Sequence, residues 1–213
     1  MFTGLIEEIG EIKNINKTHK GCVLTISCDL ITNDISLGDS ICVNGVCQSV
    51  IELKSDYIKT ELSNETLSIT TFANAKISEK VNLEKALKAN SRLDGHIVNG
   101  HIEAVSNCTN IKDEGFSKVF TFLMPKNIEK YMVYKGSIAI NGVSTTISDI
   151  NNKTFSVTII PLTLKKTTFN TVKIGDFVNI ETDITAKYIE KILLSFDNTN
   201  KIDKNLLEVN GFI

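Results

Sequence analysis

The chain of 213 residues lacks the features that mark several large classes of protein. Its formal net charge is only −2, so there is no basic field of the kind that gathers nucleic acid or anionic lipid. No run approaches the roughly 18 apolar residues of a membrane-spanning helix, and no basic leader precedes an apolar stretch at the N-terminus. We therefore expect a cytoplasmic protein with neither nucleic acid nor a membrane among its partners.

The chain also lacks the common motifs of metal, nucleotide and hydrolase sites. Its five cysteines are odd in number and include no C-x-x-C pair, which argues against a disulfide framework and against a zinc site. There is no Walker loop, no G-x-G-x-x-G, no H-E-x-x-H and no G-x-S-x-G. We expect reduced thiols, no metal and no cofactor.

What the chain does contain is a long internal repeat. Segment 40–50 recurs as segment 137–147, and the pair Asn44-Gly45 returns 97 residues later as Asn141-Gly142. Further blocks in each half keep the same register. A repeat of this length is a whole duplicated domain, since solenoid units are only roughly 20 to 50 residues long. We expect three parts, which are a first domain over 1–96, a second over 97–186 and a tail over 187–213.

Within each half the pattern indicates short strands. In segment 22–28 Val23, Thr25 and Ser27 alternate with Cys22, Leu24, Ile26 and Cys28, a period-two pattern rich in β-branched residues that indicates a half-buried strand. Each Asn-Gly pair lies between two alternating apolar stretches, the strongest short hairpin signal, and short helical turns are expected at Asn64 and Pro161. Regularly spaced strands and turns favour an antiparallel barrel or sandwich. We favour closed barrels, because open sheet edges invite association. The expected strands of the two hairpins are 40–43 with 46–51 and 137–140 with 143–147.

The tail has a helical period instead. Over residues 186–196 the apolar positions Ile189, Ile192, Leu193 and Phe196 form one stripe of an amphipathic helix. A second apolar set over 206–213 is compatible with another short helix. The stripe must be buried either on the chain's own barrels or against the same helix in sister subunits.

The two halves differ at a few equivalent positions, where the second half has gained a histidine and a carboxylate. Ser144 and Thr146, two positions apart on one strand, point to the same face, as Cys47 and Ser49 do. Such polar ladders suit a heteroaromatic ligand with carbonyls and ring nitrogens. The differing pairs are Cys47 with Ser144, Ser49 with Thr146, Leu5 with His101, and Ala86 with Asp183.

Structural interpretations of the same residues stay open. Most serines and threonines on strands are solvated, and a strand cysteine such as Cys47 is more often a small buried hydrophobe than a nucleophile. Asp183 also fits a helix cap before the tail. His101 is the residue most suited to titrate near neutral pH.

A series of short motifs runs along the whole chain. They are Met1-Phe2-Thr3-Gly4, Gly38-Asp39-Ser40, Asn44-Gly45-Val46-Cys47, the run from Gly95 to His101, Tyr134-Lys135-Gly136-Ser137, Gly142-Val143-Ser144, Ile160-Pro161, Thr163-Leu164 and Asn210-Gly211-Phe212. In this order they resemble the riboflavin synthase family. The resemblance implies an all-β fold of two homologous six-stranded antiparallel Greek-key barrels plus a C-terminal helix, assembled as a homotrimer. It also implies cofactor-independent transfer of a four-carbon unit between two 6,7-dimethyl-8-ribityllumazine molecules per active site, and a possible lumazine synthase shell.

The resemblance also implies roles for individual residues. His101 is the expected base or proton shuttle, Ser144 and Thr146 bond the ring, Asp183 orients them, and Cys47 is a further catalytic candidate. The first pocket is expected to use Gly4, Leu5, Ile6, Cys47, Gln48, Ser49, Glu61, Leu62, Ser63, Asn64, Glu65 and Thr66, with Phe2, Thr3 and Ser40 as further candidates. The second is expected to use Gly100, His101, Ile102, Lys135, Ser144, Thr145, Thr146, Thr158, Ile159, Ile160, Pro161, Leu162 and Thr163.

The chain departs from the family pattern in places. Gln48-Ser49 stands where Leu-Thr is usual, Leu162 where Glu is common, and Asn141 where Asp is frequent. The alternative function is a non-catalytic lumazine- or flavin-binding antenna protein of the same fold. A weaker alternative is the flavin-binding barrel of an oxidoreductase, but the chain carries no nucleotide-binding domain beside it.

Overall fold

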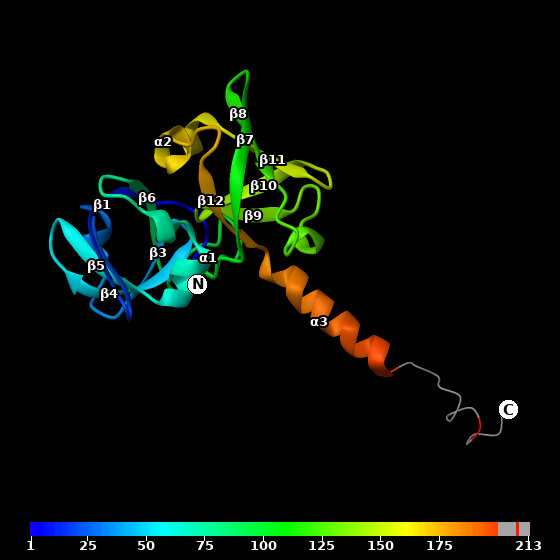
Figure 1. The fold of residues 1–213 in the computed structure, drawn as a ribbon, viewed down its shortest axis with the longest axis horizontal. Helices are drawn as coiled ribbons and strands as arrows, with labels where there is room; N and C mark the ends of the chain where they lie inside the picture. The colour runs from blue at the N-terminus through cyan, green and yellow to red at the C-terminus, as the bar shows by residue number, and fades with distance from the viewer. Residues whose placement is uncertain (200–207, 209–213) are drawn as a thin grey trace. The chain divides into compact units, whose positions relative to one another are not determined.

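The computed structural model describes residues 1–199 and residue 208, and its fold is all-β with one long helix. The first repeat forms a closed six-stranded antiparallel barrel in the order β1-β2-β5-β4-β3-β6 (Figure 1). Its strands are β1 (Glu8–Thr18), β2 (Gly21–Ser27), β3 (Ser40–Val43), β4 (Val46–Leu53), β5 (Tyr57–Leu62) and β6 (Lys80–Lys85). Short helical turns connect some of them, namely η1 (Ile31–Asp34), α1 (Asn64–Ile69) and η2 (Thr71–Asn74).

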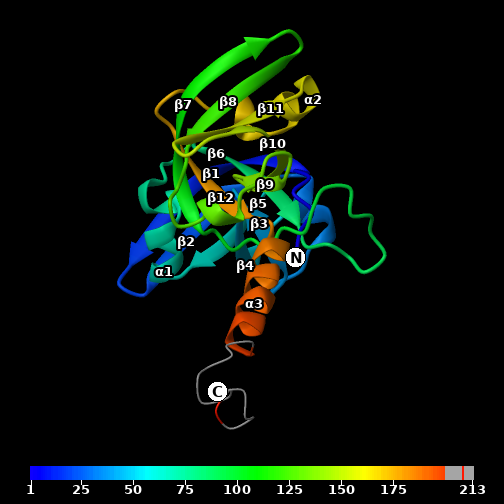
Figure 2. The same ribbon diagram turned by 90° about the vertical axis from the view of Figure 1, so that its right-hand side faces the viewer.

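The second repeat forms a second closed barrel in the order β10-β11-β8-β7-β12-β9, and its long β7–β8 hairpin extends beyond the other strands (Figure 2). The predicted fold class is therefore confirmed. The strands are β7 (Ala104–Glu114), β8 (Ser117–Leu123), β9 (Ser137–Ile140), β10 (Val143–Ile150), β11 (Thr154–Ile159) and β12 (Phe177–Thr182). The connecting turns are η3 (Glu129–Tyr131), α2 (Pro161–Lys166) and η4 (Thr168–Asn170).

Both predicted Asn-Gly hairpins are present. Asn44 and Gly45 join β3 to β4 with φ of 45° and 83°, and Asn141 and Gly142 join β9 to β10 with φ of 47° and 79°. Left-handed backbone at both central positions is the conformation that matches the twist of the flanking strands. A Cβ on Gly45 would lie 2.8 Å from the backbone nitrogen of Gly142, so the two turns also pack back to back.

The two short helices begin where the sequence indicates, with one difference. Pro161 occupies the first turn of α2, where its missing N–H costs nothing. Asn64 is not the cap of α1, because the side chain of Ser63 accepts the hydrogen bond from the backbone N–H of Thr66. Ser63 has extended backbone, which suits the capping position.

Each barrel encloses its own apolar core. The first core contains fully buried side chains such as Leu24, Ile58 and Leu83, and the second contains a cluster of phenylalanines. The rings of Phe120 and Phe169 meet edge to face at 5.0 Å between centroids, an arrangement that adds to the stability gained from burial.

Buried asparagines join the two barrels by equivalent bonds. Asn82 Nδ2 donates to the backbone oxygen of Asn141 at 2.9 Å, and Asn179 Nδ2 donates to that of Asn44 at 2.8 Å. Buried amide groups need hydrogen-bond partners, and each of these asparagine side chains finds its partner in the other repeat. Two threonine amides complete the set, with Thr168 N donating to Asn82 Oδ1 and Thr71 N to Asn179 Oδ1.

The predicted tail helix is present as α3 (Ile184–Thr199), which begins directly after Asp183. Its apolar side chains Tyr188, Ile189, Ile192, Leu193 and Leu194 are all more than half exposed. The second apolar set, over 206–213, lies outside the described residues except for Glu208. Within residues 1–199 and at residue 208, no helix has the length and apolar character needed to cross a membrane. The boundaries at 96 and 186 stay predictions.

Candidate active site

The N-terminal segment lies on the second barrel, although it precedes the first. Gly4 accepts a hydrogen bond through its backbone oxygen from the N–H of Ser144 at 2.8 Å. Ile6 packs against the apolar core of the second barrel. A Cβ on Gly4, whose φ is +77°, would lie 2.6 Å from that of Ser144. Only glycine permits this close approach to Ser144 on β10.

The segment before β7 makes the reciprocal contact. The backbone oxygen of Gly100 accepts a hydrogen bond from the N–H of Cys47 at 2.9 Å, and Ile102 is buried in the core of the first barrel. A Cβ on Gly100, with φ of +81°, would lie 2.6 Å from that of Cys47. An antiparallel bridge between Phe2 and Val98 joins the two exchanged segments.

This exchange differs from the grouping expected from sequence. Gly4 was expected beside Cys47, and Gly100 beside Ser144, whereas the structure places each glycine against the opposite repeat. The two arrangements have the same internal symmetry. For this reason, matching motifs between the repeats cannot tell them apart.

A histidine that the sequence reasoning did not select lies beside Ser144. His96 Nδ1 is 2.7 Å from Ser144 Oγ, and the ring is 7% exposed. Burial lowers the pKa of His96, while the negative charge of Asp183 opposes that shift. Among the described residues, its Nε2 has no hydrogen-bond partner. A neutral imidazole with one free nitrogen, beside a serine hydroxyl, is suited to proton transfer.

His101, the histidine chosen from sequence, occupies the other exchanged segment and is exposed. It follows Gly100, whose backbone oxygen bonds to Cys47, and so belongs to the segment that contacts Cys47 and not to the one that contacts Ser144. The available signal for His96 was its position in the same short run, Asp94-Gly95-His96, that leads to His101.

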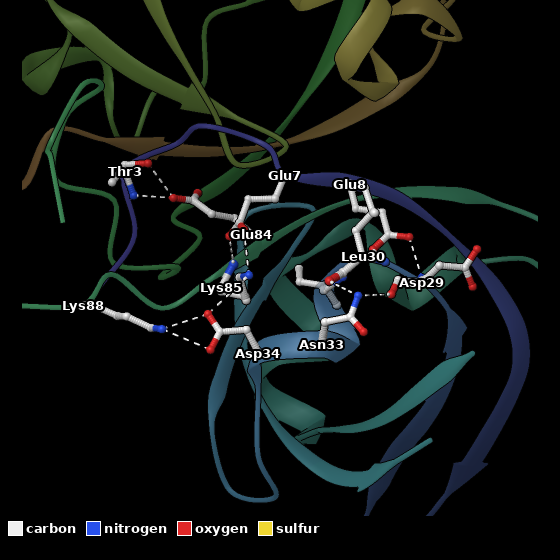
Figure 3. A network of polar contacts seen from close by, with 11 residues as sticks. Thr3, Glu7, Glu8, Asp29, Leu30, Asn33, Asp34, Glu84, Lys85 and Lys88 are labelled. Atoms are coloured by element: carbon white, nitrogen blue, oxygen red, sulfur yellow. Dashed lines mark hydrogen bonds and ion pairs between the residues drawn. The ribbon is translucent and has the colours of Figure 1, made fainter. Parts of the chain in front are cut away.

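A buried carboxylate anchors each exchanged segment. Glu84 accepts hydrogen bonds from Thr3 N and Thr3 Oγ1, both at 2.6 Å (Figure 3). It also accepts one from Gly4 N at 3.0 Å. Glu181 accepts hydrogen bonds from three successive backbone amides, which are Asn99 N at 2.6 Å, Gly100 N at 2.8 Å and His101 N at 2.9 Å. Burial raises the pKa of Glu84, and it raises the pKa of Glu181 to about 7.

Strand alternation divides the predicted ligand residues into two faces. Cys47, Ser49, Ser144 and Thr146 lie on the outward face of β4 and β10, with Ser49 and Thr146 exposed. Others point into the barrels, so only their backbones are available to a ligand. These inward residues are Gln48, whose Oε1 accepts from Thr60 Oγ1, Leu62, Thr145, which donates to the oxygen of Ile138, and Ile159.

The remaining predicted residues gather at the ends of two equivalent strands and at one turn. Lys135 precedes β9 with a φ of +66°, and its ammonium lies 5.0 Å from the centre of the Tyr134 ring. The first set, Glu61, Ser63, Asn64, Glu65 and Thr66, passes from β5 into α1, and the second, Thr158, Ile160, Pro161, Leu162 and Thr163, passes from β11 into α2.

An open pocket of about 670 Å³ adjoins the N-terminal segment. Its wall includes Thr3, Leu5 and Ser40 from the predicted set, together with Glu84. Polar backbone, hydroxyl and carboxylate groups beside an apolar side chain can hold a flat polar ring. In the described part of the chain, no cluster of histidine, cysteine and carboxylate side chains is arranged to hold a metal ion.

The comparisons with known proteins identify the family to which the two barrels belong. The model of the family described as "Lumazine binding domain" matches residues 3–86 and again 99–183. Riboflavin synthase of Photobacterium phosphoreum is 40% identical over the full length of both chains. That of Actinobacillus pleuropneumoniae is 41% identical over 91% of this chain and 90% of its own.

The chain belongs to the riboflavin synthase family. The two family matches coincide with the two barrels, so the repeat seen in the sequence is a repeated lumazine-binding domain. A solved structure of LumP complexed with 6,7-dimethyl-8-(1'-D-ribityl) lumazine is also similar, with a TM-score of 0.78 and 26% identity over 85% of this chain and 99% of LumP.

Family membership gives the exchanged segments a meaning. In this member of the riboflavin synthase family, a segment held by Glu84 or Glu181 packs against a strand of the opposite repeat. The two contacts share a backbone geometry but differ in side chains, with Cys47 at one and Ser144 at the other.

Proposed function

We propose that this protein is a riboflavin synthase. It takes two molecules of 6,7-dimethyl-8-ribityllumazine and transfers a four-carbon unit from one to the other, which gives riboflavin and 5-amino-6-ribitylaminouracil. The observation that carries the proposal is the pair of equivalent but chemically different sites in a chain that matches riboflavin synthases over its full length. Two copies of one compound need two similar sites, and the donor and acceptor roles require those sites to differ.

The chemistry needs a proton removed from the C7 methyl group of one lumazine and an addition at C7 of the other. His96 with its free Nε2, and Ser144 at 2.7 Å from its Nδ1, form the group in this chain best placed to move a proton. We assign ring contacts to Thr146 and Ser144 at one site and to Cys47 and His101 at the other. Asp183 stabilises a protonated His96 by its charge.

Most of the rate enhancement should come from holding two rings in register, because a fixed geometry replaces a bimolecular encounter. The homotrimer implied by the family would supply the second ring, by placing the first barrel of one subunit against the second barrel of a neighbour. The exposed apolar face of α3 supports this proposal, since such a face needs a partner. Association with a lumazine synthase shell is a further proposal. Location in the cytoplasm suits five unpaired cysteines.

The test is incubation of the pure protein with 6,7-dimethyl-8-ribityllumazine alone. We expect riboflavin fluorescence to grow and one 5-amino-6-ribitylaminouracil to form for each riboflavin, with no added metal or cofactor. Tight binding of the lumazine without turnover would instead assign the chain to the non-catalytic antenna class.

A further inference from the structure

Glu84 and Glu181 are each only 3% exposed, at equivalent positions of β6 and β12. Within the described residues, neither carboxylate forms an ion pair with a lysine or arginine. Burying an unpaired carboxylate is costly, so hydrogen-bond donors must compensate for the lost water. In both cases the donors belong to the exchanged segments. We infer that each carboxylate serves to hold its segment in place.

The two carboxylates do not hold equivalent groups. The third donor to Glu84 is the hydroxyl of Thr3, whereas the third donor to Glu181 is the backbone N–H of His101. Glu181 therefore fixes three successive residues from 99 to 101, and with them the direction in which the His101 side chain leaves the segment. Gly100, the middle residue of the three, contacts Cys47.

The surroundings of Glu181 make its charge state sensitive to pH near neutrality. From the exchanged segment before β7 the carboxylate of Glu103 acts on it, and from β3 the thiol of Cys42, which is fully buried. The neighbouring strand β9 presents Ala139, which has no charge. A protonated carboxyl would have a donor of its own and fewer acceptor positions, so it could not satisfy all three amides.

We propose that Glu181, although it belongs to the second barrel, is a positioning residue for the pocket of the first, where its ionised form holds Gly100 and His101 against Cys47. Because the pKa of Glu181 lies at about 7, raised by burial and by Glu103, the ionised fraction grows as the pH rises through neutrality. The first pocket is then loosened at pH 6 and ordered at pH 8. The activity readout of this inference rests on the proposed function.

The experiment compares Glu181→Gln with Glu181→Asp and with the matched variant Glu84→Gln. Turnover of the lumazine and quenching of riboflavin fluorescence on binding are measured from pH 5.5 to 8.5. In the wild type, activity and affinity should fall together below about pH 7. Glu181→Gln should lower kcat/KM by about 10- to 100-fold at pH 8 and abolish this acid limb. Glu181→Asp should restore part of the acid limb. Glu84→Gln should have a lower kcat/KM than the wild type but keep the acid limb.

Hydrogen exchange gives a readout that does not depend on turnover. Peptides covering 97–103 should exchange faster in Glu181→Gln than in the wild type at pH 8, while those covering 1–6 should not. A Glu181→Gln variant with the wild-type pH profile and unchanged exchange would overturn the inference. If the wild type makes no riboflavin but its binding still follows the predicted pH dependence, the proposed function fails and the role of Glu181 stands.

Discussion

His96 and Ser144 are 48 residues apart in the chain and 2.7 Å apart in space, the Nδ1 of one against the Oγ of the other. Their contact exists because the segment containing His96 runs beside the N-terminal segment, where His96 N donates to the oxygen of Thr3 at 3.2 Å. The pair thus connects the junction of the two repeats to β10.

Replacing Ser144 with alanine should lower turnover of the lumazine by roughly 100-fold, the order expected when a proton-transfer partner is lost. Stability should fall by about 1 to 3 kcal/mol at most, because the Nδ1 of the buried His96 loses its hydrogen-bond partner. Ser148→Ala is the control, since the hydroxyl of this serine on the same strand donates to the oxygen of Ser156. Equal rates in the two variants, measured by riboflavin fluorescence at matched melting temperature, would remove Ser144 from the mechanism.

The exchanged segments can be tested with glycine variants. Gly4 and Gly38 both have left-handed backbone, with φ of +77° and +89°, but a Cβ at Gly38 meets nothing within 4 Å. Gly38→Ala should therefore cost only about 1 kcal/mol of backbone strain. Gly4→Ala should cost clearly more and also weaken ligand binding, because its Cβ displaces Ser144. Calorimetry and a binding titration measure both effects, and similar losses in the two variants would contradict the close approach.

Replacing a buried asparagine between the barrels should lower the stability of the fold. Asn82→Ala would leave the buried N–H of Thr168 and the oxygen of Asn141 without partners, at a cost of about 1 to 3 kcal/mol. The melting temperature should fall by several degrees, since about 1 kcal/mol corresponds to about 2 to 4 °C in a chain of this size. Asn107→Ala, which removes an exposed bond to Gly175, should have almost no effect.

Glu181 should also make the free energy of unfolding depend on pH. Its folded pKa of about 7 exceeds the ordinary 4.5, so the folded state binds the proton more tightly. This contribution is complete below pH 4.5 and is lost as the pH rises to 7, a change on the order of 1 to 3 kcal/mol. Urea midpoints of Glu181→Gln should decline less over this range than those of the wild type. A parallel decline in both proteins would show that other groups cause it.

Removing residues 187–213 should lower the mass of the protein in solution from that of a trimer to that of a monomer, because the apolar face of α3 would be lost. Light scattering on the truncated and full-length chains measures this directly. A full-length chain that is already monomeric would contradict the trimer, and a truncated chain that stays trimeric would place the interface elsewhere.

The two barrels could be predicted from the sequence, because the repeat and the Asn-Gly pairs can be recognised from short stretches of neighbouring residues. Asn44 and Gly45 specify their hairpin wherever the strands pair, and strand alternation places Cys47 and Ser49 on one face. That same alternation implies that Gln48 points inward, towards Thr60. A family motif gives the ligand residues as a consecutive run, and such a run does not separate the inward Gln48 from the outward Cys47 and Ser49.

The site was only partly predictable, for a reason that concerns the pairing of distant segments. Nothing in residues 2–6 states which barrel they will cover, and the deciding contact, Gly4 with Ser144, spans the chain. His96 was missed for the same reason, because its importance depends on Ser144 and not on its neighbours in sequence.

The exchange of segments has a consequence for how such a chain can arise. A polypeptide with one repeat would leave its own outward strand uncovered where Gly100 covers Cys47, and only a second copy contributing its N-terminal residues would complete it. Fusion of two copies makes that mutual completion permanent. It also allows each covering segment to diverge independently, as Leu5 and His101 have done.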